Sequence, residues 1–301
     1  MFCRWRFFHF EFSDTLFMHR IPYNILNSLL VFALFLSSFL STTLSVEAQR
    51  VVSLMPSVTV ALAQIGADDA VVGRTSYCPK ATNGKTVLVG DAMTVNIESI
   101  VALRPDVVVA SNFTKQATVD RLKTLGIKVV QLSTPADFDD MCSQVQMLAS
   151  LVGKSAEATK HIDDERVKVT AALKQIRQVL QQKGMVQTKV YVQVGTRPAF
   201  GATPDYYLGK MTADLGMTNA LALGEGMCSK EEVMARNPSL IIVSSMGGLG
   251  KDEAAEWRRL LTKSCVMVID ETVLAQPTPQ NYRVTLEAIY ANMLKPQQVT
   301  Q

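Results

Sequence analysis

The chain has 301 residues, of which 48% are hydrophobic and 19% are charged, and its formal net charge is +3. This length and composition suffice for two α/β domains with hydrophobic cores of their own, and they exclude a disordered chain. The small net charge, without a lysine and arginine cluster interleaved with aromatic residues, excludes a nucleic-acid-binding surface.

The N-terminal segment, residues 1–48, has the pattern of a secretory signal peptide. A basic start precedes an apolar run at 25–40, which is short for a membrane span, and a small residue, Ala48, follows. We expect cleavage after Ala48, with Met18 as a second candidate for the true start. The alternative is an uncleaved membrane anchor. The next cysteine is Cys78, so we expect no lipoprotein anchor and a periplasmic mature protein.

The first half of the mature chain alternates strands and helices, as a parallel sheet with crossover helices does. Glycines at 66 and 126 stand where the expected helices end. The predicted strands are 50–54, 71–73, 107–110 and 127–132, and the predicted helices are 56–65 and 114–125.

Residues 154–183 contain neither proline nor glycine, and their apolar residues recur at helical spacing among many charges. This pattern predicts one long amphipathic helix that ends at Gly184. Its place in the middle of the chain favours a rigid bridge over a flexible linker. The expected domains are an α/β lobe at 49–152, a bridging helix at 153–184 and a second α/β lobe at 185–301.

The second lobe again alternates strands and helices. A loop at 195–204 is punctuated by glycine and proline, which predict turns. The predicted strands are 189–194, 240–244 and 266–269, and the predicted helices lie around 207–215 and at 282–294.

An internal repeat supports two similar lobes. Residues 97–111 (IESIVALRPDVVVAS) reappear, degenerately and without a gap, as residues 230–244 (KEEVMARNPSLIIVS), and each copy predicts a short helix, a proline and a buried strand. Glu98 and Glu231 open the two helices, where the helix dipole favours negative charge, so helix capping is the simpler interpretation. Their occurrence as a matched pair favours a second interpretation, in which a symmetric partner binds both carboxylates.

Four cysteines remain in the expected mature chain, and export permits disulfides. Two lie in each lobe, so pairing Cys78 with Cys142 and Cys228 with Cys265 would respect the domains, but spacing does not choose among the three pairings. Burial as free thiols is the alternative, because a core of this size needs no cross-link.

The residues for common catalytic sites are missing. His161 is the only histidine after residue 48, and no nucleophile elbow, phosphate-binding loop or dinucleotide fingerprint is present. We therefore expect a binding protein without catalytic residues or a resident cofactor, and a monomer when free. The alternative is an exported enzyme that uses Cys78 or Glu225 as its reacting group.

Ligands of open α/β sheets bind outside the carboxyl ends of the strands. The loops expected there carry aromatic side chains that offer apolar faces to a sizeable, partly flat ligand, and Arg197 can meet a carboxylate or phosphate. Packing of these aromatic residues on their own lobe is the alternative. The candidate ligand-binding residues are Pro56, Ser57, Tyr77, Phe113, Arg197, Phe200, Tyr206 and Gln276.

Five ordered segments resemble a known family: 50–57 (RVVSLMPS), 72–73 (VG) with 76–79 (SYCP), 96–106 (NIESIVALRPD), 125–129 (LGIKV) and 229–238 (SKEEVMARNP). From residue 50 to about 294 the chain resembles the periplasmic solute-binding proteins of the helical-backbone class, which serve ABC importers of vitamin B12, haem and ferric siderophores. The resemblance implies two Rossmann-like lobes bridged by one long helix, with a ligand cleft between the lobes that closes little. It also implies that Glu98 and Glu231 pair with arginines on the two subunits of an ABC permease dimer in the inner membrane.

The ligand implied by the resemblance is a metal complex. Tyr77 matches a cleft tyrosine of the B12 binders, but tyrosine also ligates ferric haem in some sites. Corrinoid binders of this class often offer tryptophans from cleft loops, whereas the only tryptophan after residue 48 is Trp257, in a charged, helix-like stretch. We expect cobalamin slightly ahead of haem and ferric siderophores, with Tyr77 a metal ligand only for haem. A stand-alone haem scavenger without an importer is a further alternative.

Overall fold

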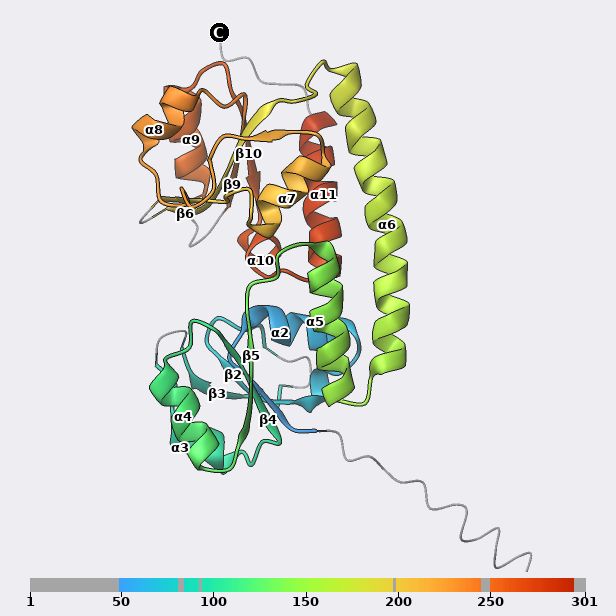
Figure 1. The fold of residues 1–301 in the computed structure, drawn as a ribbon, viewed down its shortest axis with the longest axis vertical. Coiled ribbons are helices and arrows are strands. Elements are labelled where there is room, and N and C mark those ends of the chain that lie inside the picture. The colour runs from blue at the N-terminus through green and yellow to red at the C-terminus, as the bar shows by residue number, and fades with distance from the viewer. Residues whose placement is uncertain (1–48, 81–83, 92–93, 197–198, 245–249, 295–301) are drawn as a thin grey trace, which may run out of the picture. The chain divides into compact units, whose positions relative to one another are not determined.

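The first sheet consists of five parallel strands in the order β3-β2-β1-β4-β5 (Figure 1). The computed structural model describes residues 49–80, 84–91, 94–196, 199–244 and 250–294, which all belong to one compact unit. The expected signal segment lies outside them. The strands are β1 (Val51–Ser53), β2 (Val71–Thr75), β3 (Val87–Gly90), β4 (Val107–Ser111) and β5 (Lys128–Leu132).

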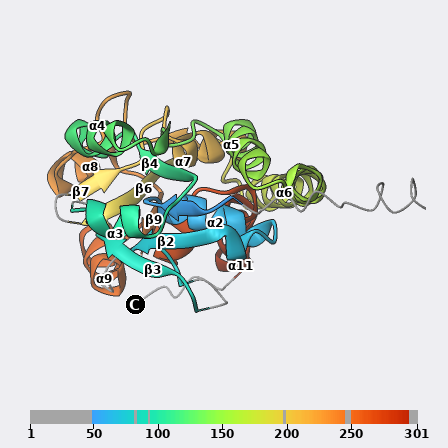
Figure 2. The same ribbon diagram turned by 90° about the horizontal axis from the view of Figure 1, so that it is seen from below.

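Helices cover both faces of this sheet because alternate strand residues point to opposite sides. Val51 and Val107 pack with α2 and α5, whereas Val52 and Val108 pack with α3 and α4. Figure 2 shows these two groups of helices on opposite sides of the strands. The helices are α2 (Pro56–Gln64), the 3₁₀ turn η1 (Asp68–Ala70), α3 (Ile97–Ala102), α4 (Gln116–Thr124) and α5 (Phe138–Leu151).

The second sheet has the order β10-β9-β6-β7, and β8 also pairs with β6. Every pairing is parallel except that of β7 with β6. The strands are β6 (Lys189–Thr196), β7 (Ala199–Gly201), β8 (Thr218–Asn219), β9 (Leu240–Ser244) and β10 (Cys265–Ile269). The helices are α7 (Tyr207–Asp214), α8 (Lys230–Arg236), α9 (Gly250–Leu260), α10 (Glu271–Leu274) and α11 (Pro279–Leu294).

One long helix, α6 (Ser155–Gln182), contributes to the cores of both sheets. Ala158 and Ile162 in its first half pack into the core of the first sheet, and Ile176 and Leu180 in its second half pack into that of the second. At 1.5 Å per residue its 28 residues span about 42 Å. The prediction of two α/β lobes bridged by one long helix is therefore confirmed, and Figure 1 shows α6 running past both sheets.

Some elements were not predicted from the sequence. The sequence patterns do not predict helix α5 or strand β3, and the segment at 195–204, which is expected to be a loop, contains strand β7. The thiols of Cys78, Cys142 and Cys228 are free, so neither disulfide that would respect the lobes is formed, and burial is the correct interpretation for these three. Within the described ranges, no helix combines the length and the apolar character that crossing a membrane requires.

Candidate ligand-binding and docking site

Glu98 and Glu231 occupy the same position in two equivalent helices. Asn96 caps α3, since its Oδ1 accepts a hydrogen bond from the Ser99 backbone N–H at 2.8 Å, and Glu98 lies two residues after this cap. Ser229 caps α8 in the same way, and Glu231 again lies two residues after the cap. Neither glutamate caps its helix.

Both carboxylates are exposed. Within the part of the chain that the structure describes, neither Glu98 nor Glu231 has an ion-pair or hydrogen-bond partner for its carboxylate. In α8 a different residue, Glu232, completes the cap by accepting the Ser229 backbone N–H at 2.7 Å. The helix dipole favours a negative charge in the first turn, and these two charges remain available to a cation of another molecule.

The equivalence of the two helices extends to the chain that follows them. Arg104 and Asn237 stand directly before a proline, and their φ angles are 45° and 48°, in the left-handed region. Strand β4 follows α3 and pairs with β1, and strand β9 follows α8 and pairs with β6. Strands β1 and β6 each come first in chain order within their sheet. The two glutamates are therefore presented by the same helix, turn and strand unit in each lobe.

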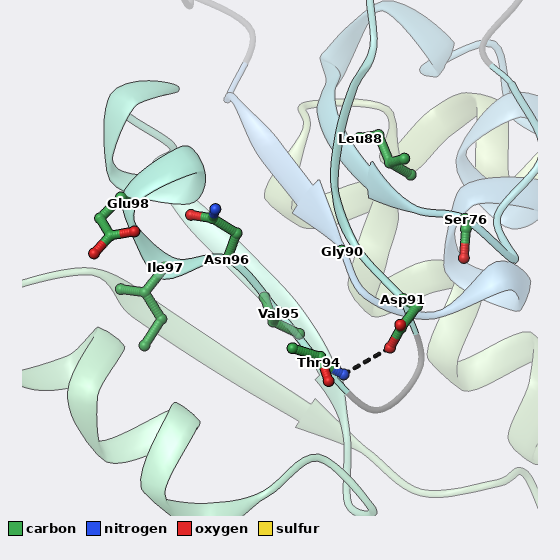
Figure 3. Close-up of a pocket in the computed structure, with 9 residues that line it drawn as sticks. All are labelled: Ser76, Leu88, Gly90, Asp91, Thr94, Val95, Asn96, Ile97 and Glu98. Carbon is green, nitrogen blue, oxygen red and sulfur yellow. Dashed lines mark hydrogen bonds between the residues drawn. The ribbon is translucent and has the colours of Figure 1, made fainter.

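An open groove of about 750 Å³ lies beside Glu98 (Figure 3). Its shape depends on Gly90, whose φ is +143°, because a Cβ there would lie 2.2 Å from the Thr94 carbonyl oxygen. The Asp91 carboxylate, at the same place, accepts a hydrogen bond from the Thr94 backbone N–H at 2.7 Å. The groove is lined by Ser76, Leu88, Gly90, Asp91, Thr94, Val95, Asn96, Ile97 and Glu98.

Four of the candidate ligand-binding residues lie together at the carboxyl edge of the first sheet. Tyr77 follows β2, Pro56 and Ser57 follow β1, and Phe113 follows β4, and these three strands are adjacent. Tyr77 is 67% exposed and Phe113 is 86% exposed, whereas Pro56 and Ser57 are half-buried at the start of α2. Two large aromatic side chains are thus held out from one edge of a sheet.

The candidates of the second lobe are more dispersed. Phe200 lies on β7, which folds back on the carboxyl end of β6, and it is 37% exposed. Tyr206 is half-buried and packs against Tyr207 with ring centroids 4.7 Å apart, and burial raises its pKa. Gln276 is half-buried after α10. Arg197 lies outside the described residues.

Two exposed apolar residues beside Phe200 were not identified from the sequence. Met227 forms an isolated antiparallel bridge with Phe200 and is 73% exposed, and Leu223 in the preceding turn is 69% exposed. The Phe200 ring packs over Gly226, where a Cβ would lie 2.5 Å from the ring. The two glycines at 224 and 226, between Leu223 and Met227, were the available signal, because a glycine-rich segment forms a turn that leaves its side chains outside a core.

The first residue of α8 is anchored to the neighbouring helix. The Lys230 ammonium lies 3.1 Å from Glu253 and 2.5 Å from Glu256, both on α9. Burial opposes its charge, but the two carboxylates outweigh this effect and raise the pKa of Lys230. Glu253 also accepts a hydrogen bond from Gln193, whose Oε1 accepts the indole N–H of Trp257 at 2.6 Å. Trp257 is therefore a buried core residue.

The groups considered for catalysis do not form a reactive cluster. Glu225 accepts hydrogen bonds from Arg236 and from the Ala222 backbone N–H, which lower its pKa and keep it ionised. Cys78 is buried at 3% exposure, and His161 lies on α6. Among the described residues, no group of three or more histidine, cysteine, aspartate or glutamate side chains is placed to hold a metal ion.

The fold and the paired helices define a two-lobed α/β protein with equivalent units in its lobes. Residues 51–262 match the family model described as "Periplasmic binding protein". This match covers more than half of the chain, which therefore belongs to the periplasmic binding protein family.

Relatives of known name share more than a quarter of the aligned residues. The chain is 27% identical over 212 residues to a "Cobalamin-binding protein" of Halobacterium salinarum, an alignment that covers 66% of this chain and 55% of the relative. It is 29% identical over 211 residues to the "Uncharacterized ABC transporter substrate-binding lipoprotein YvrC" of Bacillus subtilis, with coverages of 67% and 65%. The chain thus spans between about half and two thirds of the length of these relatives.

Solved structures share the fold. The periplasmic vitamin B12 binding protein BtuF of Vibrio cholerae superposes with a TM-score of 0.66 at 21% identity, covering 82% of this chain and 95% of that one. The periplasmic heme binding protein HutB of Vibrio cholerae superposes with a TM-score of 0.67 at 18% identity, covering 82% and 99%. At these identities the likeness establishes the two-lobed fold alone.

Proposed function

We propose that this chain is the extracytoplasmic solute-binding component of an ABC importer, which captures a metal chelate and delivers it to a membrane permease. The observation that carries this proposal is the pair of exposed carboxylates, Glu98 and Glu231, at equivalent places in two helices. A single first-turn glutamate is explained by the helix dipole alone. Two equivalent, unneutralised ones suit a partner that itself has two equivalent subunits.

The docking partner would meet each carboxylate with a cation. Beside Glu98, the groove combines apolar side chains such as Leu88 and Ile97 with the negative charge at its end, which suits an apolar segment carrying an arginine. Charge complementarity of this kind sets the association rate and the orientation of a complex. The partner proposed is an ABC permease dimer of the inner membrane, and the free protein is proposed to be a monomer.

The ligand would bind between the carboxyl edges of the two sheets. Tyr77 and Phe113 from the first lobe and Phe200 from the second offer exposed aromatic faces, and Met227 adds a soft thioether beside Phe200. Such surfaces suit a large, partly flat metal complex. Cobalamin stands slightly ahead of haem and ferric siderophores, because cobalamin or vitamin B12 is what several relatives are named for. Pro56, Ser57, Arg197, Tyr206 and Gln276 complete the proposed contact set.

We further propose that the chain is exported by a signal peptide cleaved after Ala48 and is not a lipoprotein, although the relative YvrC is named as one. Lobe boundaries at 49–152 and 185–301, with the bridge at 153–184, remain our proposal. Because the named relatives are binding proteins and Glu225 and Cys78 lie in unreactive surroundings, we propose no enzymatic activity.

Ligand binding tests this function directly. The exported protein is mixed separately with cyanocobalamin, haemin and a ferric hydroxamate, and binding is followed by absorption spectra and calorimetry. We expect saturable binding of one of the three with one ligand per chain. If haemin is the ligand, we expect a shifted Soret band that is lost in Tyr77→Phe, because the phenol oxygen would be the iron ligand.

Tyr290→Phe provides the matched control. Tyr290 is a half-buried tyrosine on α11 that packs against the core of the second sheet, so its hydroxyl should not affect the spectrum. Failure of all three compounds to bind the unchanged protein would contradict the proposed ligand class.

A further inference from the structure

Tyr77 lies on a short turn whose two ends are buried. Thr75, which ends β2, is 1% exposed and Cys78 is 3% exposed, whereas Tyr77 between them is 67% exposed. The Cys78 backbone N–H donates to the Thr75 carbonyl at 3.2 Å, and the Ser76 N–H donates to the Gly90 carbonyl at 2.9 Å. The ring is therefore carried into solvent on a base that is itself held by the protein.

One arginine joins the ends of this turn. Nη1 of Arg74 donates to the Thr75 carbonyl and to the Cys78 carbonyl, both at 3.0 Å. A guanidinium group is planar and its donors have fixed directions, so it restrains two acceptors more tightly than a flexible lysine would. Nε of Arg74 is buried without a hydrogen-bond partner among the described residues. A buried N–H group without a hydrogen-bond partner lowers the stability of the fold. The presence of arginine at position 74 is therefore not explained by a gain in stability.

The turn is also tied to the neighbouring strand. Sγ of Cys78 lies 3.1 Å from Oγ1 of Thr75 and 3.7 Å from the Ser53 carbonyl oxygen at the end of β1. Oγ of Ser53 in turn accepts a hydrogen bond from Thr59 on α2 at 2.8 Å. The base under Tyr77 is thus connected to the strand and helix that carry Pro56 and Ser57, the other candidate ligand contacts of this edge.

We infer that Arg74, with Cys78, is a positioning residue for ligand binding: it holds the turn that presents Tyr77 to a flat metal chelate. This inference rests on the proposed function. If Tyr77 were on an unrestrained loop, the ligand would have to order that loop, and the entropy lost would weaken binding. A turn that is already held in place avoids this cost. Arg74 acts through Tyr77 and makes no contact with the ligand itself.

A double-mutant cycle separates this role from a general effect on the fold. Affinities for haemin and for cyanocobalamin are measured with the unchanged protein, Arg74→Gln, Tyr77→Ala and the double variant. We expect Arg74→Gln to weaken binding by about threefold to tenfold when Tyr77 is present, from the usual cost of ordering one side chain. In the Tyr77→Ala background the same change should have no effect. An equal loss in both backgrounds would overturn the inference.

Arg50→Gln is the matched control. Arg50 also binds backbone, donating from Nε and Nη2 to the Leu103 carbonyl at 3.1 and 2.9 Å, but it precedes β1 at the opposite edge of the same sheet. It should leave affinity unchanged. If Arg74→Gln does not fold, Thr75→Val removes the Oγ1 contact with Cys78 at nearly constant volume and should show the same dependence on Tyr77.

Backbone amide exchange tests the inference without a ligand. The Ser76 and Cys78 backbone N–H groups both donate hydrogen bonds at this turn. In Arg74→Gln these two amides should exchange faster by at least about tenfold, while the amides of the second lobe stay unchanged. In Arg50→Gln the amides of Ser76 and Cys78 should exchange as in the unchanged protein. Unchanged exchange at the turn would overturn the inference. If the unchanged protein bound none of haemin, cyanocobalamin and the ferric hydroxamate, the proposed ligand class would fail, and the exchange measurement would still decide whether Arg74 holds the turn.

Discussion

His161 and Glu165 lie one turn apart on α6, where the helix faces α11. Glu165 is 3% exposed and accepts hydrogen bonds from Arg283 at 2.5 Å and from Lys168 at 3.0 Å. Burial opposes ionisation of Glu165, but these hydrogen bonds outweigh it and hold its pKa below the ordinary value. If α11 moved away from the bridging helix, the buried Glu165 carboxylate would lose the Arg283 guanidinium and keep an uncompensated charge. The contact between Glu165 and Arg283 therefore holds α11 on the bridging helix.

Burial also lowers the pKa of His161, although the negative charge of Glu165 opposes this shift. The folded protein therefore takes up a proton at His161 less readily than the unfolded chain, whose histidine titrates near pH 6.5. Stability should fall as pH decreases from about 7.5 to about 5.5, because the unfolded state then binds more protons. In His161→Gln, the share of this decrease in the free energy of unfolding that comes from His161 should disappear. Urea unfolding at the two pH values measures it, and an unchanged pH dependence in His161→Gln would contradict the assignment.

Single residues show how far sequence alone could predict the site. Exposure of Tyr77 and Phe113 follows from their place after buried parallel strands, which the sequence indicates. Tyr206 is adjacent to Tyr207 at a helix start, and only packing reveals that the two rings contact each other. The pairing of Glu165 with Arg283 joins residues 118 positions apart, a separation over which local patterns carry no information.

At the scale of elements, α6 was predicted within one residue at each end, because its helical periodicity is long and uninterrupted. Helix α5 was missed although its signals were present: Asp137 caps it, and Gly153 with φ +68° follows its end. Strand β3 is a four-residue edge strand with exposed Val87 and Leu88, so it lacks the buried run that identified the other strands. Short edge elements depend on contacts that single-sequence patterns do not contain.

Two positions on α6 test its role as part of a core. Ile176 is fully buried in the core of the second sheet, so Ile176→Ala should lower the free energy of unfolding by about 2–5 kcal/mol. Val167, on the same helix, is 72% exposed, and Val167→Ala should change it by less than about 0.5 kcal/mol. Denaturant unfolding followed by circular dichroism measures both. Equal losses in the two variants would show that α6 is not packed as described.

The anchoring of α8 on α9 provides a second test at this scale. Lys230→Met leaves Glu253, which is only 15% exposed, without its cation, and should lower the free energy of unfolding by about 1–3 kcal/mol. Lys251→Met removes the same charge from an exposed position on α9 and should change it by less than about 0.5 kcal/mol. Unfolding is followed by the fluorescence of Trp257, which lies 5.7 Å beneath the Lys230 ammonium. Indistinguishable stabilities would contradict the anchoring.

At the scale of the whole molecule, the sequence repeat correctly predicted two lobes with equivalent helix, turn and strand units. The contacts between the lobes could not be predicted in this way. Lys210 on α7 pairs with Asp137, the cap of α5, at 3.1 Å, and Gln64 on α2 donates to Asn281 on α11 at 3.3 Å. These contacts hold helices of one lobe against helices of the other. Because they join the two lobes directly, in addition to the bridging helix, they favour a stiff support over a freely hinged one.

The central claim is that the two lobes present matched carboxylates to a partner, and that the ligand is held by other side chains. Docking to the partner permease in membrane vesicles, with ligand affinity measured in parallel, tests this claim for Glu98→Gln, Glu231→Gln and the double variant. Glu157→Gln is the control, because Glu157 is also an exposed first-turn glutamate, on α6 outside the repeat.

We expect each single change to weaken docking by about tenfold or more, the double change to abolish docking, and ligand affinity to stay within about twofold. Glu157→Gln should dock normally. Docking of the double variant as tight as that of the unchanged protein, or loss of its soluble ligand binding, would contradict the account.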